Sequence, residues 1–365
     1  MGPFDTSLVI AVVGLATPIL FAALGELVSQ RSGVINIGLE GMMLNGAFFS
    51  FWAAHATHSL LLGVLGGLAA GAFLGAIMGA LTVSAGGDQI VVGVGINILA
   101  VGITTFANEQ LFTSGGNQPS IEPMAHLQIP GLVHLPVIGK AFFDRVPLAY
   151  IAYLMVPLIW YVLYRTNLGL VIRGSGEYPD AVETSGVSVK SVRWCGALFA
   201  GGMAGLGGAM LTVGNLGVFN ELMSGGRGFI ALAAVIFGRW RPVGVLGACL
   251  VFGGADALEL RLQAESSIPR QVWVVLMLIP LLVIAYMVVR SGIRRIARAD
   301  LIFGGAVFLA GLVLAVVEPS WRVPSEFWLM LPYVITLVVL AGLVGRARMP
   351  AAVGLPYRSA AALDS

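Results

Sequence analysis

The chain has 365 residues, of which 58% are hydrophobic and only 10% are charged, and its formal net charge at pH 7 is +2. Soluble domains carry about 25% charged residues, so a chain this poor in charge could not cover its surface in water. The composition therefore argues against a soluble enzyme, a nucleic-acid-binding protein and a disordered chain, and it favours an all-α integral membrane protein.

Apolar runs of about 18 residues predict transmembrane helices. Eleven candidate runs divide the chain, although some are too short to span a bilayer alone. They predict a polytopic helix bundle of about 11 spans, formed by a single membrane domain covering residues 1–365. In chain order the runs are residues 7–28, 33–53, 60–83, 91–112, 147–164, 193–213, 228–238, 243–259, 272–289, 301–317 and 327–344.

Two of these runs are predicted to be broken or re-entrant helices. The run 33–53 is interrupted by four glycines, and it also contains polar side chains. The run 228–238 is the weakest of the eleven, because it is too short to cross a bilayer. Non-helical backbone at membrane depth is tolerated only where neighbouring protein or water satisfies it, so we expect both segments to be buried.

The positions of lysine and arginine predict the orientation, because cytoplasmic loops are enriched in both. Placing the loop 165–192 in the cytoplasm gives 14 basic residues inside and 6 outside. The N-terminus is then outside and the C-terminus is cytoplasmic. The inside set is Arg31, Arg165, Arg173, Lys190, Arg193, Arg239, Arg241, Arg290, Arg294, Arg295, Arg298, Arg346, Arg348 and Arg358, and the outside set is Lys140, Arg145, Arg227, Arg261, Arg270 and Arg322.

Two long connections separate the apolar runs. The external loop 113–146 is rich in proline and is predicted to form a structured cap. In the inner loop 165–192, Pro179 suits the first position of a helix and Gly186 suits its C-terminal cap. The pattern predicts a short helix from Pro179 to Ser185, which could dock into a groove on a soluble partner or could simply be a cytoplasmic loop helix.

Glycines at every fourth position predict close helix packing. Gly67, Gly71, Gly75 and Gly79 share one helical face, and Gly201, Gly205 and Ala209 form a weaker stripe. Small residues in such a stripe let a neighbouring backbone approach closely. The alternative is that glycine is merely frequent, since the chain has 49 glycines.

No catalytic constellation is present in the sequence. It contains no phosphate-binding GxxxxGK[ST] motif and no nucleophile beside a base. Cys195 and Cys249 both lie in apolar runs, and the four histidines lack convincing metal-ligand spacing. We therefore expect no enzymatic activity, no metal and no cofactor.

Polar side chains inside the apolar runs are the informative residues, because a charge at the centre of a membrane helix costs about 2.5–3.5 kcal/mol. Those singled out are Asn36, Glu40, Asn45 and Asn97. They could line a pathway for a hydrophilic solute. They could equally form hydrogen bonds between helices or cap breaks in a helix.

Several motifs resemble those of a known transporter family. The chain is similar to permease subunits of ABC importers of the branched-chain amino acid and ribose type, and most similar to the nucleoside, or "simple sugar", permeases. The resemblance covers nearly the whole chain. It rests on Gly25-Glu26, the block from Arg31 to Gly41, the block from Asp88 to Gly93 with Asn97, the segment Gly176–Gly186, the block from Gly225 to Gly238 with Pro242, Arg261-Leu262-Gln263 and the tail Pro356-Tyr357.

The resemblance implies a permease that works with two ATP-binding subunits, a second permease, identical or homologous, and an external solute-binding protein. It implies that 165–192 is the coupling loop through which the ATPase drives the membrane helices. The chain differs from this subgroup in one respect, since its segment 272–317 is predicted to form an extra pair of helices. The coupling residues carried over are Glu177, Pro179, Asp180, Ala181, Glu183 and Gly186.

The expected function is thus inward transport of a polar solute, a nucleoside or a sugar, across the bacterial plasma membrane. Branched-chain amino acids are an alternative substrate class. A stand-alone secondary transporter or channel is the alternative function, but such proteins favour inverted repeats or paired charges, and neither is clear in this sequence. The sequence does not identify the solute.

Overall fold

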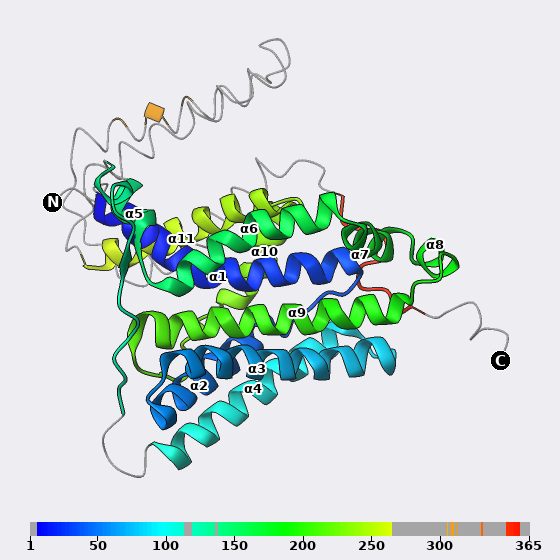
Figure 1. Cartoon of the computed structure of the whole chain (residues 1–365), viewed down its shortest axis with the longest axis horizontal. Helices are drawn as coiled ribbons and strands as arrows, with labels where there is room; N and C mark the ends of the chain where they lie inside the picture. The colour runs from blue at the N-terminus through cyan, green and yellow to red at the C-terminus, as the bar shows by residue number, and fades with distance from the viewer. Residues whose placement is uncertain are drawn as a thin grey trace.

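A computed structural model describes residues 6–112, 119–135, 138–264 and 348–357, together with five isolated positions between 305 and 330. The predicted helix pair 272–317 and the run 327–344 lie, apart from those isolated positions, outside the described residues. The described part is almost entirely helical, as predicted (Figure 1).

Eleven α-helices form the described part of the bundle. They are α1 (Thr6–Ser32), α2 (Leu39–Thr57), α3 (Leu60–Gly79), α4 (Gln89–Leu111), α5 (Ile138–Phe143), α6 (Pro147–Arg165), α7 (Asn167–Glu177), α8 (Pro179–Thr184), α9 (Val189–Ala209), α10 (Arg227–Phe237) and α11 (Pro242–Ala264). Wider π-type turns, η1 (Ala80–Ser84) and η4 (Met210–Leu216), extend α3 and α9, and a short 3₁₀ turn, η3 (Leu132–His134), precedes α5.

Six of these helices are long and apolar enough to cross a membrane: α1, α3 with η1, α4, α6, α9 with η4, and α11. They coincide with six of the predicted runs. The other two predicted runs that fall in the described residues behave differently. The helix α10 has 11 residues, which is about 16 Å at 1.5 Å per residue, so it is half a span, as its short apolar run predicted.

The run 33–53 does contain an unwound section, but at its beginning. Residues 33–38, here called the break segment, are not helical, and α2 is a continuous helix after them. Gly41 and Gly46 therefore do not interrupt a helix. Cβ atoms placed on them would lie too close to the backbones of Asn97 and Gly205, so these glycines allow α2 to pack tightly against α4 and α9.

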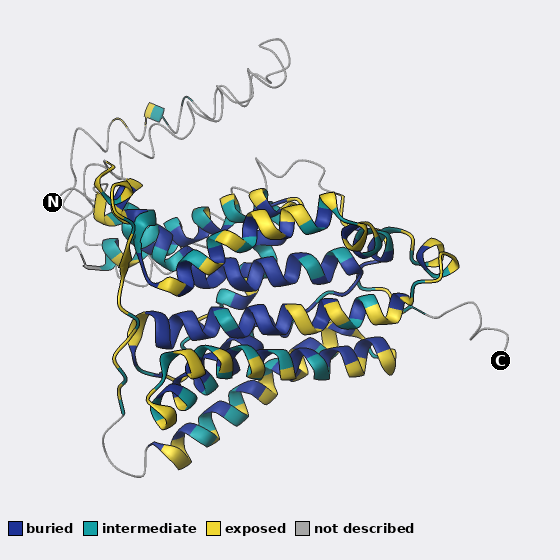
Figure 2. Ribbon diagram, in the orientation of Figure 1, coloured by how far each residue is buried: buried dark blue, intermediate teal, exposed yellow. Residues whose placement is uncertain are grey.

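The core is centred on α1 and α9, which lie side by side through the middle of the bundle (Figure 2). Ile19, Phe21 and Leu24 of α1 are completely buried. By contrast, α3 and α4 are largely exposed along their apolar sides. In a membrane protein such a face meets lipid or another apolar subunit.

The two ends of the bundle differ in character. At one end α8 projects beyond the long helices, with α7 and the described tail, residues 348–357, beside it, whereas α1 begins at the opposite end (Figure 1). The opposite end carries the described parts of the predicted loop 113–146. There Leu127–Gln128 (β1) pairs antiparallel with Asp144–Arg145 (β2), so the all-α prediction is wrong for this small strand pair.

The glycine stripe of α3 packs directly on α9, as the sequence predicted. A Cβ atom placed on Gly71 would overlap the carbonyl oxygen of Gly201, and one on Gly75 would lie 2.6 Å from the carbonyl oxygen of Ala197. At both positions the obstacle is backbone, which cannot move aside like the end of a flexible side chain. The two helix backbones therefore touch along the crossing.

We expect Gly71→Ala to destabilise the protein by about 1–3 kcal/mol, because the added methyl group must push α3 away from α9. Gly102→Ala in α4 is the matched control, since a Cβ atom there would meet nothing within 4 Å. Melting temperatures of both variants in detergent check the prediction. Equal melting temperatures would show that the contact between α3 and α9 does not limit stability.

Candidate translocation and coupling site

The break segment is held by side chains from α1 and α4. The backbone amide of Ile35 donates to Gln89 Oε1 at 2.7 Å, and that of Asn36 donates to Glu26 Oε1 at 3.0 Å. The Asn97 amide donates to the carbonyl oxygen of Ile37 at 3.0 Å. These three side chains replace the hydrogen bonds that the unwound backbone lacks, which is the condition for losing helix inside a membrane bundle.

Glu26 is the most deeply placed of these groups. Its side chain is completely buried, and its Oε1 also accepts a hydrogen bond from the Gln30 amide at 2.8 Å. Its second oxygen, Oε2, has no hydrogen-bond partner among the described residues. The Glu26 carboxylate thus connects the last turns of α1 to the backbone of the break segment.

Glu40 caps the short helix α10. Its two carboxylate oxygens accept hydrogen bonds from the backbone amides of Gly226 at 2.8 Å and Gly228 at 2.7 Å. Amides at the N-terminus of a helix lack partners within the helix, and a negative charge there also meets the positive end of the helix dipole. A Cβ atom on Gly228 would overlap the backbone of Glu40, so glycine is what lets the carboxylate come this close.

The three asparagines predicted to line a pathway also make structural contacts. Asn97 Oδ1 accepts from the Gly41 amide at 2.8 Å, so one side chain of α4 holds both the break segment and the start of α2. Asn36 is completely buried and accepts from the Gly38 amide at 3.0 Å. Asn45 donates weakly, at 3.4 Å, to the carbonyl oxygen of Ala70, and its own oxygen has no partner among the described residues.

The structure thus brings Asn36, Glu40 and Asn97 together around one feature, the start of α2, and places Asn45 one turn and a half further along that helix. The contacts are those of a brace for a broken helix, which was one of the two readings of the sequence. Whether these side chains also touch a solute stays a prediction.

The helix α8 has the capped form that the sequence predicted, but it ends one residue earlier, at Thr184. Gly186 has a φ of +87°, which explains the glycine. Val182 is buried against the backbone of Gly174, whereas Ala181 is exposed. The helix therefore has an inner face that packs on α7 and an outer face that is free to meet a partner.

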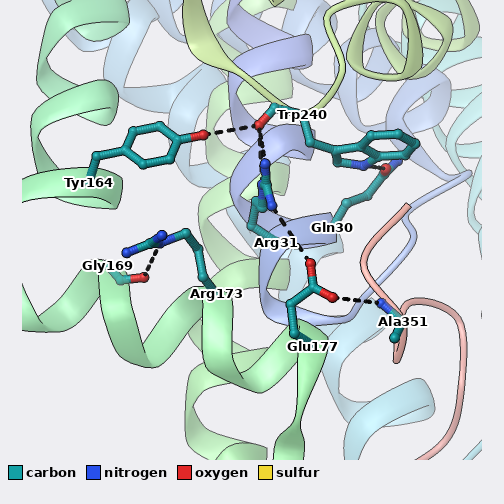
Figure 3. A network of polar contacts seen from close by, with 8 residues as sticks. All are labelled: Gln30, Arg31, Tyr164, Gly169, Arg173, Glu177, Trp240 and Ala351. Atoms are coloured by element: carbon teal, nitrogen blue, oxygen red, sulfur yellow. Dashed lines mark hydrogen bonds and ion pairs between the residues drawn. The ribbon is translucent and has the colours of Figure 1, made fainter. Parts of the chain in front are cut away.

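A polar network joins α7 to the turn between α10 and α11 (Figure 3). Arg31, at the end of α1, lies 3.9 Å from a carboxylate oxygen of Glu177 and donates two hydrogen bonds, at 2.7 and 3.1 Å, to the carbonyl oxygen of Trp240. The Trp240 indole donates to Gln30 Oε1 at 2.6 Å. Two neighbouring residues of α1 therefore hold both the backbone and the side chain of Trp240.

Sequence reasoning did not single out Gln30 or Trp240, and it treated Glu26 only as part of a motif. A carboxylate inside the apolar run 7–28 was a signal in the sequence that could have identified Glu26. No local pattern could have connected Trp240 with Gln30, because 210 residues separate them. The helix α7 was also missed, since its glycine-rich and polar sequence was interpreted as loop.

Comparison with known proteins places the chain in a family. Residues 8–285 match the family described as the branched-chain amino acid transport system / permease component. A guanosine ABC transporter permease, NupQ of Bacillus subtilis, is 34% identical over 94% of this chain and 93% of its own length, and a nucleoside ABC transporter permease, NupC of Lactococcus lactis, is 33% identical over the same shares. A putative glucose ABC transporter permease of Haloferax volcanii is 42% identical over 72% of this chain and 80% of its own length.

No solved structure matches the chain. The chain belongs to the permease family, and it is a multi-pass membrane subunit of an ABC importer rather than an enzyme.

We expect Glu40→Gln to lower stability by about 1–3 kcal/mol, because an amide can accept only one of the two backbone hydrogen bonds and presents its NH₂ group to the other. Solute uptake is expected to fall as well. Glu109→Gln, an exposed carboxylate near the end of α4, is the matched control. Melting temperature and uptake are measured together, and a loss of uptake with an unchanged melting temperature would assign Glu40 to the solute instead of to the brace.

Proposed function

We propose that the chain is the permease of an importer for nucleosides, with α8 in the cytoplasm as the docking point of the partner ATPase. The observation that carries the proposal is the position of α8. It is a short, capped helix between α7 and α9, with an exposed outer face, at the end of the bundle where α1 ends and where α10 meets α11.

The nucleoside assignment is supported by the two relatives that are named for guanosine and nucleosides. Each of them matches along almost its entire length, as does this chain. The relative named for glucose is more similar in the part that matches, but that part is shorter. A sugar is therefore the second candidate, and a nucleoside, which contains a sugar, shares the hydroxyl groups that such a site would recognise.

The orientation is supported by the positive residues. The predicted cytoplasmic set has eight described members, and they lie in or beside the segments that meet at the α8 end of the bundle: Arg31, Arg165, Arg173, Lys190, Arg193, Arg239, Arg241 and Arg348. Cytoplasmic segments are enriched in Lys and Arg. We place the N-terminus and the loop 113–146 outside, where a solute-binding protein would deliver its cargo, in the plasma membrane of a bacterium.

Transmission from the ATPase is supported by contacts that start beside α8. Its neighbour Glu177 contacts Arg31, and Arg31 binds the carbonyl oxygen of Trp240 directly after α10. The other end of α10 is bound by Glu40 of α2. A displacement of α8 could thus be transmitted to α10 and the break segment through a continuous set of polar contacts.

The assembly that follows contains two ATP-binding subunits, a second permease of the same or a related sequence, and an external solute-binding protein. The exposed apolar faces of α3 and α4 are available to lipid and to the second permease. The residues proposed for ATPase coupling are those of α8 and its borders, Glu177, Pro179, Asp180, Ala181, Glu183 and Gly186.

The substrate is tested by uptake. Cells that lack their own nucleoside and glucose uptake are given the complete transporter, with its ATPase and binding protein, and are offered radiolabelled guanosine or glucose. We expect accumulation of guanosine that unlabelled nucleosides suppress and glucose does not. Accumulation of glucose alone would replace the nucleoside assignment with the sugar one.

Docking at α8 is tested by Ala181→Trp. The bulky side chain would stand on the exposed face of α8, and overpacking an interface costs about 1–3 kcal/mol, so we expect the ATPase to co-purify poorly and ATP hydrolysis to lose its response to solute. Ser120→Trp, an exposed position at the opposite end of the bundle, is the matched control. Wild-type co-purification of the ATPase with Ala181→Trp would mean that the ATPase binds elsewhere.

A further inference from the structure

Residues 348–357, here called the tail strap, lie across the α8 end of the bundle (Figure 1). Their backbone is tied to two other segments. The amide of Ala352 donates to the carbonyl oxygen of Gly176 at 2.8 Å, and the amide of Gly354 donates to that of Gly33 at 3.3 Å. Val353, between them, is only 4% exposed. The strap is therefore packed on the end of α7 and on the first residue of the break segment.

Arg193 connects the strap to α9. Its side chain is 2% exposed, and its guanidinium donates to the carbonyl oxygens of Leu355 at 2.7 Å and Ala352 at 3.3 Å. The same guanidinium lies over the ring of Tyr357, 5.6 Å from its centroid. Burying a cation is costly unless its donors are satisfied. Here the strap supplies acceptors for both terminal nitrogens, whereas Nε has no hydrogen-bond partner among the described residues.

Gly33 provides the room for this arginine. A Cβ atom at Gly33 would lie 2.8 Å from a guanidinium nitrogen of Arg193, and Gly33 also has a φ of +103°. The turn at the end of α1, the buried arginine and the strap therefore fit together as one unit. Any other residue at this turn would be strained and would also displace the guanidinium.

Tyr357 ties the end of the strap to α8. Its hydroxyl donates to a carboxylate oxygen of Glu183. Burial, and then the neighbouring Glu183 carboxylate, raises the pKa of the Tyr357 phenol, so its hydroxyl stays protonated and acts as the donor. This hydrogen bond joins α8 to a segment 174 residues away in the chain, whereas the side-chain hydrogen bonds of Thr184 and Ser185 are to backbone oxygens three residues away.

We propose that the tail strap sets the orientation of α8 for the ATPase, with Arg193 and Tyr357 as positioning residues. Arg193 anchors the strap on α9, and Tyr357 holds α8 through Glu183. The inference rests on the proposed docking of the ATPase at α8. It adds that α8 is held both by its chain connection to α7 and by the strap. A displacement of α8 would then be transmitted to α1 and α9 and would not be absorbed by the loop alone.

The anchoring step is tested on the full chain alone. Cys195→Ser and Cys249→Ala remove the native thiols, and Val353→Cys places a reporter under the strap. We expect a thiol reagent to label this cysteine on the order of tenfold faster in Arg193→Met than in the parent chain, because the strap loses its charged hydrogen bonds. Lys190→Met, an exposed cation on the same helix, is the control and should leave the rate unchanged. Equal labelling rates in Arg193→Met and Lys190→Met would overturn the anchoring role.

The positioning step is tested in the assembled transporter with guanosine or glucose, whichever accumulates in the uptake assay. In Tyr357→Phe we expect the ATPase to remain bound while the amount of solute moved per ATP hydrolysed falls severalfold. Shortening the chain to end at Tyr357 is the control and should preserve this ratio. A wild-type ratio in Tyr357→Phe, with Ala181→Trp still releasing the ATPase, would overturn the strap inference alone, whereas an ATPase that stays bound to Ala181→Trp would overturn the docking proposal itself.

Discussion

The rest of the structure depends on how the unwound backbone between α1 and α2 is satisfied. A bilayer offers no water to an exposed amide or carbonyl group, so six residues without helix must find their hydrogen bonds inside the protein. Here α1 provides Glu26 and α4 provides Gln89 and Asn97. This requirement fixes where α2 begins, and it brings Glu40 to the N-terminus of α10.

Much of the bundle could be predicted from the sequence, because each prediction needed only local information. Apolar runs marked the long helices, the spacing of glycine marked the face of α3 that packs on α9, and Pro179 with Gly186 marked α8. The partners of the polar residues could not be predicted. Glu40 accepts hydrogen bonds from backbone amides 186 and 188 residues away. The periodicity of the sequence does not indicate which of many backbone amides a carboxylate will bind. The contacts of the tail strap could not be predicted for the same reason, since its hydrogen bonds with Arg193 and Glu183 join residues 159 to 174 positions apart in the chain.

Two kinds of packing divide the bundle. The glycine contact between α3 and α9 is backbone on backbone, so neither helix can shift without separating from the other. At α10 a close backbone contact between Gly228 and Glu40 is combined with charged side chains that hold the ends of the helix, Glu40 at the start and Arg31 just beyond the end. Hydrogen bonds to long side chains can be exchanged or rotated at less cost than a closely packed backbone contact.

This division gives the polar residues at the break a role that does not require contact with the solute. Because α10 is half a span, its N-terminus lies inside the bundle, where the Glu40 carboxylate offsets the positive end of its dipole. Releasing that contact would leave a half-buried charge and two amides without partners, which is unfavourable unless water or a polar solute replaces the hydrogen bonds. In the proposed importer, a hydrophilic cargo that reached this cap would supply replacement hydrogen bonds and would make the cap easier to open. A displacement of α10 driven from α8 would favour the same opening, so arrival of the solute and work by the ATPase would act on one set of hydrogen bonds.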